Sequence, residues 1–133
     1  MSPELIAWLT RTDHEPVSGW APEPRGDALH CDDELVARLS EIARPVAGTA
    51  RVFVAGCPVV HHPAGPPIAA AAGARTLVVR SDRPAGALAA DEVTALGPGW
   101  RALDPWSTDI AFAKATDLLR GHIAHAYEQA EAA

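Results

Sequence analysis

The spacing of apolar residues predicts two helices in the first third of the chain. Pro3 lies between a serine and a glutamate, which is typical of a helix start, and an apolar face extends the predicted helix over residues 3–12. A second helix is predicted to begin at Asp32 or Asp33 and to end before Pro45, because the residue before a proline avoids the helical conformation. Its apolar positions recur at helical spacing: Leu35, Val36, Leu39 and Ile42.

The middle of the chain predicts a loop and extended segments. Residues 13–31 carry prolines and glycines without periodicity, which predicts a long loop. Residues 49–56 alternate polar and apolar side chains and include β-branched and aromatic residues, so they predict a strand. We interpret residues 66–81 as a β-hairpin with Gly73 in its turn, because the segment is too short for a helical crossover between parallel strands.

The last third predicts a short helix, a strand and a long helix. Residues 89–96 end at a Gly-Pro pair, which indicates a short helix. Residues 100–106 alternate as a last strand would, and Ser107 or Thr108 is predicted to cap the final helix. The sequence therefore predicts an α+β fold: a small antiparallel sheet of about three to five strands packed against helices, with a long C-terminal amphipathic helix.

Length and composition predict one domain with a thin core. The chain has 133 residues, and 28 of them are alanine, so few large side chains are available for burial. We expect a single domain over residues 1–133. Within it, residues 1–31 form an N-terminal helix and an acidic loop rich in proline and glycine, and residues 32–133 form a compact α+β body.

The charge distribution narrows the range of partners. Eight acidic and two basic side chains among residues 1–34 account for the whole formal net charge of −6. The remaining residues carry no net charge, which argues against nucleic acid as a partner. The N-terminus lacks the pattern of a signal peptide, and no apolar run is long enough for a membrane span, so a cytoplasmic protein is predicted. Cys31 and Cys57 are then expected to be free thiols.

Catalytic chemistry has one candidate nucleophile. Cys57 directly follows the predicted strand at residues 49–56, and His61 or His62 could serve as its base. A small buried thiol at a strand end is the commoner interpretation, so the balance is against an enzyme. The six histidines and two cysteines do not show the spacing of a known metal motif. We therefore expect neither a metal nor a cofactor.

Polar and aromatic residues near predicted strand ends favour a binding groove. The groove would form where the loop at residues 57–67 meets the hairpin and the last strand. Its predicted ligand contacts are His61, His62, Arg80, Trp100 and Trp106.

The back half of the chain shows an ordered series of features. A proline-rich lead-in precedes the hairpin, the short helix, the Gly-Pro turn, a strand that begins at Trp100, and a final helix with a late Tyr127. This order resembles the MmcQ/YjbR-like and luciferase-domain families of small bacterial proteins over about residues 60–130. The resemblance rests mainly on these two residues together with Gly65 and Gly73.

The resemblance implies a compact α+β fold with an antiparallel sheet, and a DNA-binding role is sometimes attached to that fold. The chain departs from the families in two places. It has Gly-Pro-Gly before Trp100, where they tend to carry a turn with Lys or Asn, and Ala126 before Tyr127, where serine is usual. The resemblance transfers no catalytic residue, and the neutral charge of the matched region weakens the DNA-binding role.

Three functional hypotheses follow from the sequence. The first is a non-catalytic cytoplasmic binding or regulatory domain for a small molecule or a protein. The second is a thiol-dependent enzyme or sensor that uses Cys57 with a histidine. The third is an interaction protein that uses its acidic N-terminal arm to meet a basic partner or its apolar strand edges to form a homodimer.

Overall fold

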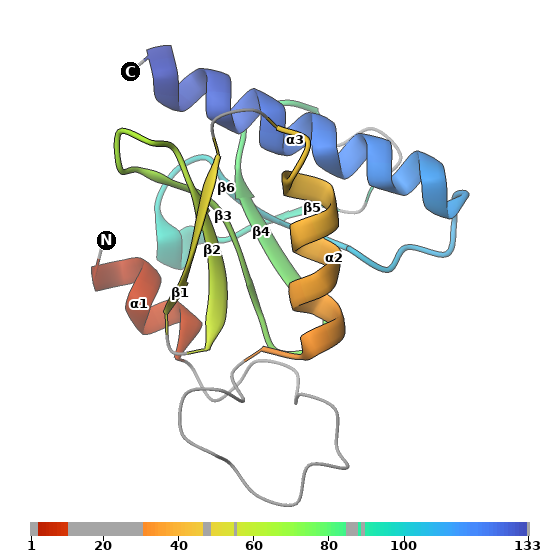
Figure 1. Cartoon of the computed structure of the whole chain (residues 1–133), viewed down its shortest axis with the longest axis horizontal. Coiled ribbons are helices and arrows are strands. Elements are labelled where there is room, and N and C mark those ends of the chain that lie inside the picture. The colour runs from red at the N-terminus through yellow and green to blue at the C-terminus, as the bar shows by residue number, and fades with distance from the viewer. Residues whose placement is uncertain are drawn as a thin grey trace, which may run out of the picture.

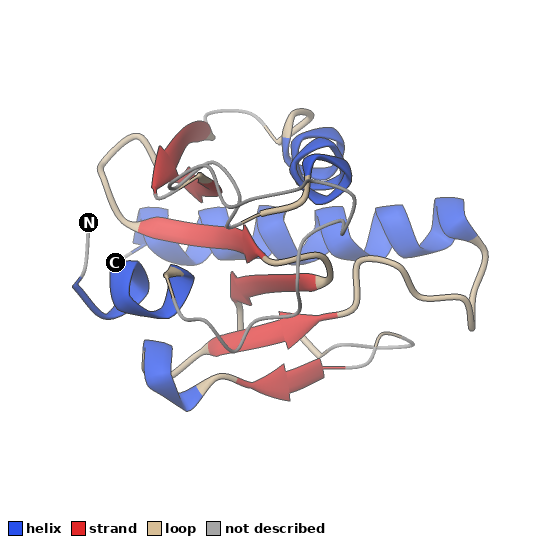
Figure 2. Ribbon diagram, turned by 90° about the horizontal axis from the view of Figure 1, so that it is seen from below, coloured by secondary structure: helices blue, strands red, loops and turns tan. Residues whose placement is uncertain are grey.

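Six strands form one antiparallel sheet, with helices packed against it (Figures 1 and 2). The computed structural model describes residues 3–10, 31–46, 49–54, 56–84, 88 and 90–132. The strands are β1 (Ala50–Val54), β2 (Cys57–His61), β3 (Pro67–Ala72), β4 (Thr76–Arg80), β5 (Ala90–Glu92) and β6 (Trp100–Leu103). Their order across the sheet is β1-β2-β3-β4-β6-β5, and every neighbouring pair is antiparallel. The predicted α+β class is confirmed, with more strands than expected.

The additional strands are β2 and β5. β2 lies within the predicted loop at residues 57–67, and its first four residues are all buried. A strand buried on both faces shows no alternation of polar and apolar residues, so its pattern resembles a short apolar loop. Pro58 fits in β2 because it is paired with Phe53 of β1 and has no partner in the β2–β3 ladder.

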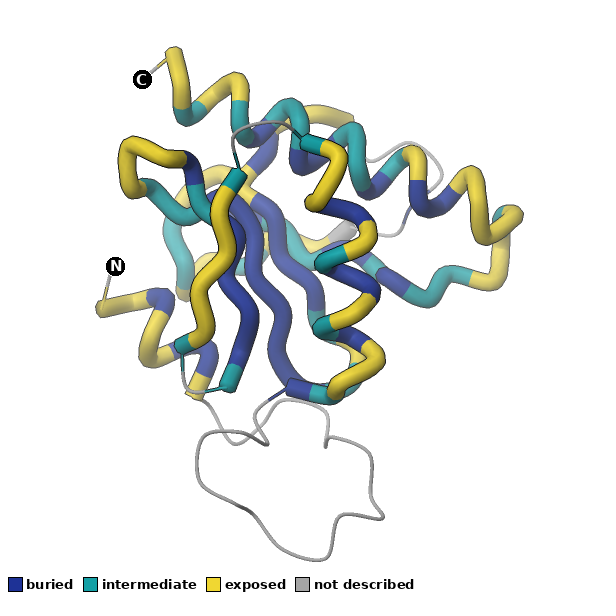
Figure 3. The backbone as a smooth tube through the Cα atoms, in the orientation of Figure 1, coloured by how far each residue is buried: buried dark blue, intermediate teal, exposed yellow. Residues whose placement is uncertain are grey.

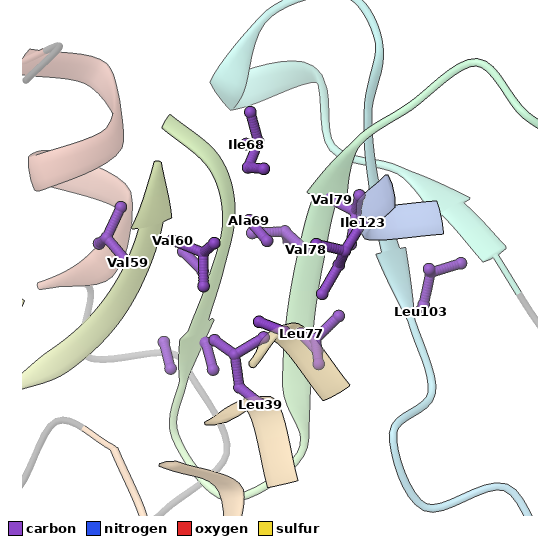
Figure 4. Packing of buried hydrophobic residues seen from close by; sticks show 14 of the residues in the cluster. Leu39, Val59, Val60, Ile68, Ala69, Leu77, Val78, Val79, Leu103 and Ile123 are labelled. Atoms are coloured by element: carbon purple, nitrogen blue, oxygen red, sulfur yellow. The ribbon is translucent and has the colours of Figure 1, made fainter. Parts of the chain in front are cut away.

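Helices cover both faces of the sheet. They are α1 (Pro3–Leu9), α2 (Asp33–Ala43) and α3 (Phe112–Ala132). α1 lies on the face to which Cys57 points, since the Cys57 Sγ is 3.8 Å from the carbonyl oxygen of Leu9. Val60 points to the opposite face and borders α2. On that face, Leu39 of α2 and Ile123 of α3 pack against the middle strands (Figure 4).

Alanines build the centre of the sheet. Residues 69–72 of β3 are alanines with no exposed surface. The buried band runs across β2, β3 and β4 and continues into the inner faces of the helices (Figure 3). Small side chains in the middle strand allow the helix backbones to approach closely, and larger residues from the helices fill the remaining volume. The thin, alanine-rich core that the composition predicts is therefore concentrated in β3.

The helix predictions near the N-terminus are confirmed at their starts. α1 covers most of the segment predicted at residues 3–12, and α2 follows Asp32, whose Oδ1 accepts a hydrogen bond from the Glu34 backbone N–H at 3.0 Å. The predicted long loop lies almost entirely at residues 11–30, outside the described residues. None of the described helices is long and apolar enough to cross a membrane.

Two predictions in the last third need correction. The helix predicted at residues 89–96 is wrong: β5 is followed by the 3-10 helix η2 (Thr94–Leu96). Pairing of β5 with β6 supplies tertiary contacts that outweigh the helical propensity of the segment. The final helix begins at Phe112, later than the cap predicted at Ser107 or Thr108.

Candidate ligand-binding site

Four of the five predicted ligand contacts lie near one end of the sheet. His61 ends β2 and is followed by His62, whereas Arg80 ends β4 and is paired with Trp100, the first residue of β6. Because neighbouring strands of the sheet are antiparallel, the last residues of β2 and β4 and the first residue of β6 lie at the same end of the sheet. We call this end, which carries Arg80, the open end of the sheet. Trp106 follows the other end of β6 and lies apart from the group.

A pocket of about 160 Å³ lies at the open end, between the sheet and the second half of α3. Its walls are mostly apolar or small side chains. The lining residues are Pro66, Pro67, Ile68, Arg80, Ala126, Gln129 and Ala130. Arg80 is therefore the single charged group in the lining, and Gln129 is the single polar neutral one.

Both polar side chains of the lining present hydrogen-bond donors. The Gln129 Oε1 accepts a hydrogen bond from the Asp82 backbone N–H at 3.2 Å, which leaves the amide NH2 group for the pocket. Among the described residues, the guanidinium of Arg80 has no hydrogen-bond or ion-pair partner. A lining that offers donors and no carboxylate side chain suits an anionic group.

The carboxylate of Asp82 is held by another residue. His125 Nε2 lies 2.6 Å from Asp82 Oδ1, so this carboxylate is already paired with a side chain of α3. The two contacts of Asp82, to Gln129 and to His125, attach the loop after β4 to successive turns of α3. They position Gln129 at the pocket.

Further contacts make the same loop rigid. Ser81 donates its backbone N–H to the Gly99 carbonyl oxygen at 2.9 Å, and the Arg101 guanidinium donates to the carbonyl oxygens of Ser81 and Arg83. The guanidinium of Arg83 lies directly over Gly121 of α3, where a Cβ would collide with it. A glycine at position 121 thus allows the loop to approach the helix closely.

The two histidines organise the turn that forms one wall of the pocket. The His62 backbone N–H donates to the Pro66 carbonyl oxygen at 3.0 Å, and His62 Nδ1 accepts from the Ala64 N–H at 3.0 Å. His61 Nδ1 lies 3.0 Å from the His62 carbonyl oxygen and must donate to it. The ring of His62 is buried and packs against Tyr127 of α3, with the ring centroids 4.6 Å apart. Their hydrogen bonds hold the turn, and neither residue lines the pocket.

The two tryptophans have other roles. Trp100 is buried and belongs to the cluster of hydrophobic core residues. Trp106 lies at the end of the sheet opposite Arg80, which we call the closed end, and donates its indole N–H to the Ala74 carbonyl oxygen at 3.2 Å. It also borders Arg38, whose guanidinium carbon is 5.7 Å from the centroid of the indole ring.

The two cysteines are buried free thiols. Cys57 begins β2 and His61 ends it, so their Cα atoms are four residue steps, about 13 Å, apart. The pair proposed from the sequence is therefore not brought together. Burial raises the pKa of Cys31 well above its ordinary value, and the nearby Cys57 and Asp32 raise it further. Neither thiol lines the pocket at the open end.

Sequence reasoning missed the contribution of α3 to the pocket. Ala126, Gln129 and Ala130 are spaced three and four residues apart, so they lie on one side of the helix. The amphipathic pattern of the helix identifies Ala126 and Ala130 as inward-facing. It gives no signal that Gln129 accepts a hydrogen bond from a loop almost fifty residues away, because only the tertiary structure brings Asp82 there.

Neither a metal site nor a similar protein of known function identifies the ligand of the pocket. Among the described residues, no group of three or more His, Cys, Asp or Glu side chains is arranged to hold a metal ion. Comparison of the chain with protein-family models, curated proteins and solved structures finds no match. The resemblance to MmcQ/YjbR-like and luciferase-domain proteins stays a prediction.

Proposed function

We propose that this protein is a non-catalytic cytoplasmic domain that binds the anionic group of a small molecule in the pocket beside Arg80. The observation that carries the proposal is the polar lining: a guanidinium with no described partner and an amide NH2 group, set among apolar walls. An anion that enters this pocket gains charge-assisted hydrogen bonds, and its apolar part covers the proline and alanine side chains.

The size of the pocket limits the ligand. A volume of about 160 Å³ is smaller than the several hundred Å³ that enclose a whole drug-sized molecule. A short carboxylate would fit, or a larger molecule could insert its anionic end. The thiol-dependent alternative has less support, because the Cys57 sulfur is buried and lies at the far end of β2 from the histidines.

The test is a titration with small anions followed by ¹⁵N-HSQC spectra. Acetate, butyrate, benzoate and inorganic phosphate are added separately to the full chain. We expect saturable shifts at the backbone amide of Arg80 and at the side-chain amide of Gln129 for at least one carboxylate, with butyrate stronger than acetate because of the apolar walls. Phosphate alone causing such shifts would change the ligand class to a phosphorylated compound.

A matched pair of variants separates a specific site from general attraction between charges. Arg80→Gln removes the guanidinium of the pocket, whereas Arg75→Gln removes an exposed arginine at the closed end, 4.0 Å from Asp104. We expect Arg80→Gln to weaken binding at least about tenfold, in line with a charge-assisted hydrogen bond, and Arg75→Gln to leave it unchanged. Equal losses in both variants, or no saturable shift with any of the anions, would refute the proposed function.

A further inference from the structure

The edge strand β1 carries apolar side chains on both faces of the sheet. Among the described strands β1 pairs with β2 alone, and four of its five residues are exposed (Figure 3). Val52 is 38% exposed toward the α1 side of the sheet, and Phe53 is 55% exposed toward the α2 side. An exposed apolar edge strand is a template for pairing with another strand.

The opposite edge of the sheet is built differently. β5 has three residues, and two of them are the exposed acids Asp91 and Glu92. Short length and charge protect an edge strand from pairing with another chain. β1 is longer, and its one charged residue, Arg51, packs against the ring of Phe53 at 5.4 Å from the ring centroid. Of the two sheet edges formed by the described strands, the β1 edge is therefore the one left suitable for pairing.

Pro58 determines which backbone groups of β1 point outward. Proline has no N–H, so its pair with Phe53 in the β1–β2 ladder is the kind without hydrogen bonds. Because the two kinds of pair alternate along an antiparallel ladder, the pair of Arg51 with Val60 is of the same kind. The backbone N–H and C=O groups of Arg51 and Phe53 are therefore directed away from β2, along the free edge.

These groups are self-complementary about Val52. A second copy of β1 that runs antiparallel, with Val52 opposite Val52, places Arg51 of each copy opposite Phe53 of the other. Both of these pairs are of the hydrogen-bonded kind, so all four outward N–H and C=O groups of each strand are used. In any register that sets Arg51 opposite Arg51, the like charges repel, whereas this register places each guanidinium beside an aromatic ring.

The surface next to β1 can accept the ring that such pairing brings in. A hollow of about 350 Å³ lies between the C-terminal end of α2 and β1, on the face to which Arg51 and Phe53 point. Its lining is Ser40, Ala43, Arg44, Thr49, Ala50, Arg51 and Val60. Phe53 of a second copy would lie opposite Arg51, at the border of this hollow. Burial of the ring there adds apolar contact to the hydrogen bonds of the strands.

We propose that two copies of this chain form a homodimer through antiparallel pairing of their β1 strands about Val52. The dimer contains one continuous sheet across the two-fold axis, with α2 and α3 of both copies on the same face. This inference is independent of the pocket at Arg80, which lies at the end of β4 and does not include a β1 residue. The pairing leaves that pocket open.

Light scattering coupled to size exclusion measures the predicted association in the full chain. We expect a mass twice the 13.9 kDa of the chain at micromolar concentration. Val52→Lys places two ammonium groups opposite each other, and it should weaken association at least about tenfold while circular dichroism and the melting temperature show a folded protein. A monomer at all concentrations refutes the proposal, and a Val52→Lys dimer of undiminished stability moves the interface away from β1.

Disulfide trapping tests the register. In Val52→Cys the two introduced thiols lie in a directly opposed pair with the Cα atoms about 4.5 Å apart, within disulfide range. Phe53→Cys is the matched control, because in the proposed register its thiols lie diagonally and beyond about 7 Å. Mild oxidation followed by peptide mapping should link Val52→Cys and not Phe53→Cys, with the buried Cys31 and Cys57 unmodified. Crosslinking of Phe53→Cys alone would refute the register about Val52.

Discussion

At each end of the sheet an arginine lies close to α3, and the two arginines have opposite environments. At the closed end, Arg38 is only 2% exposed. Its Nε donates to the Pro105 carbonyl oxygen at 3.0 Å, its Nη1 donates to Thr116 Oγ1 at 2.6 Å, and its guanidinium carbon is 4.1 Å from the centroid of the Phe112 ring. This side chain connects α2, the segment after β6 and α3, so its role is structural.

At the open end, Arg80 is exposed and lines the pocket without a partner among the described residues. Asp82, two residues further along the chain, is paired with His125. The protein therefore gives the Nε and Nη1 of Arg38 hydrogen-bond acceptors within the fold and leaves the guanidinium of Arg80 for a ligand. Four predictions test this difference.

The largest effect is expected from Arg38→Ala. The change removes two hydrogen bonds, leaves the Pro105 carbonyl oxygen and the Thr116 hydroxyl without their donor, and opens a cavity beneath Phe112. We expect the free energy of unfolding to fall by about 3 kcal/mol, measured by urea denaturation at neutral pH. Arg80→Ala is the matched control and should change the free energy of unfolding by less than about 0.5 kcal/mol. Equal losses in both variants would remove the distinction between the two ends.

The second effect concerns the exclusion of water from the closed end. Cys31 forms an isolated bridge with Gly73 of the β3–β4 turn, and burial raises the pKa of its thiol in the folded state. The unfolded chain therefore loses this proton at lower pH than the folded protein does. Below about pH 8.5 the thiol is protonated in both states, and its contribution to the free energy of unfolding is complete. Above that pH the free energy of unfolding falls by about 1.4 kcal/mol for each pH unit.

Urea denaturation at pH 8 and pH 10 measures this contribution. We expect the wild type to lose about 2 kcal/mol more between the two pH values than Cys31→Ser, whose hydroxyl does not titrate in this range. The same fall in both proteins would mean that the Cys31 thiol is hydrated in the folded state, and that the closed end is as open to water as the pocket.

The sequence predicts the closed end better than the open end. A cap of α2 at Asp32 or Asp33 and Gly73 in the β3–β4 turn both follow from local rules. The strand predicted over residues 100–106 is shorter in the structure and ends at Leu103. The two strands missed from the sequence have a common cause. β2 is buried on both faces and β5 has three residues, so neither displays the alternation that identifies a strand.

The open end depends on contacts between residues far apart in the chain. Arg80 is identified from the sequence because it ends an apolar run, and the structure places it in the pocket lining. His61 and His62 are also identified, but their role in holding the turn depends on hydrogen bonds to backbone groups that no side-chain pattern shows. Gln129 is not identified, since an exposed glutamine on a helix is ordinary and its partner, Asp82, lies in the loop after β4.

The third prediction uses Gln129→Glu to test whether the pocket needs a donor. The substitution keeps the shape of the side chain and an oxygen that can accept the Asp82 N–H, but it replaces the NH2 group with a second, negatively charged oxygen. We expect the affinity for a carboxylate to fall about tenfold, about 1.4 kcal/mol, in the same titration that tests Arg80. Gln129→Ala is the control for loss of the donor without added charge and should have a smaller effect. Unchanged affinity in Gln129→Glu would place the ligand elsewhere at the open end.

The smallest effect is expected for the ion pair that attaches the loop after β4 to α3. His125 and Asp82 are partly and largely exposed, with side-chain exposures of 35% and 73%. Solvent screens such a pair, so a double-mutant cycle with His125→Ala and Asp82→Ala should give a coupling free energy of about 0.5 kcal/mol, measured by urea denaturation. The corresponding cycle with Arg38→Ala and Thr116→Val at the closed end should give a larger value, because that hydrogen bond is buried. A coupling free energy at Asp82 as large as the one at Arg38 would mean that contacts within the fold also stabilise the open end. The contrast between a structural arginine and a ligand-binding arginine would then rest on Arg80 alone.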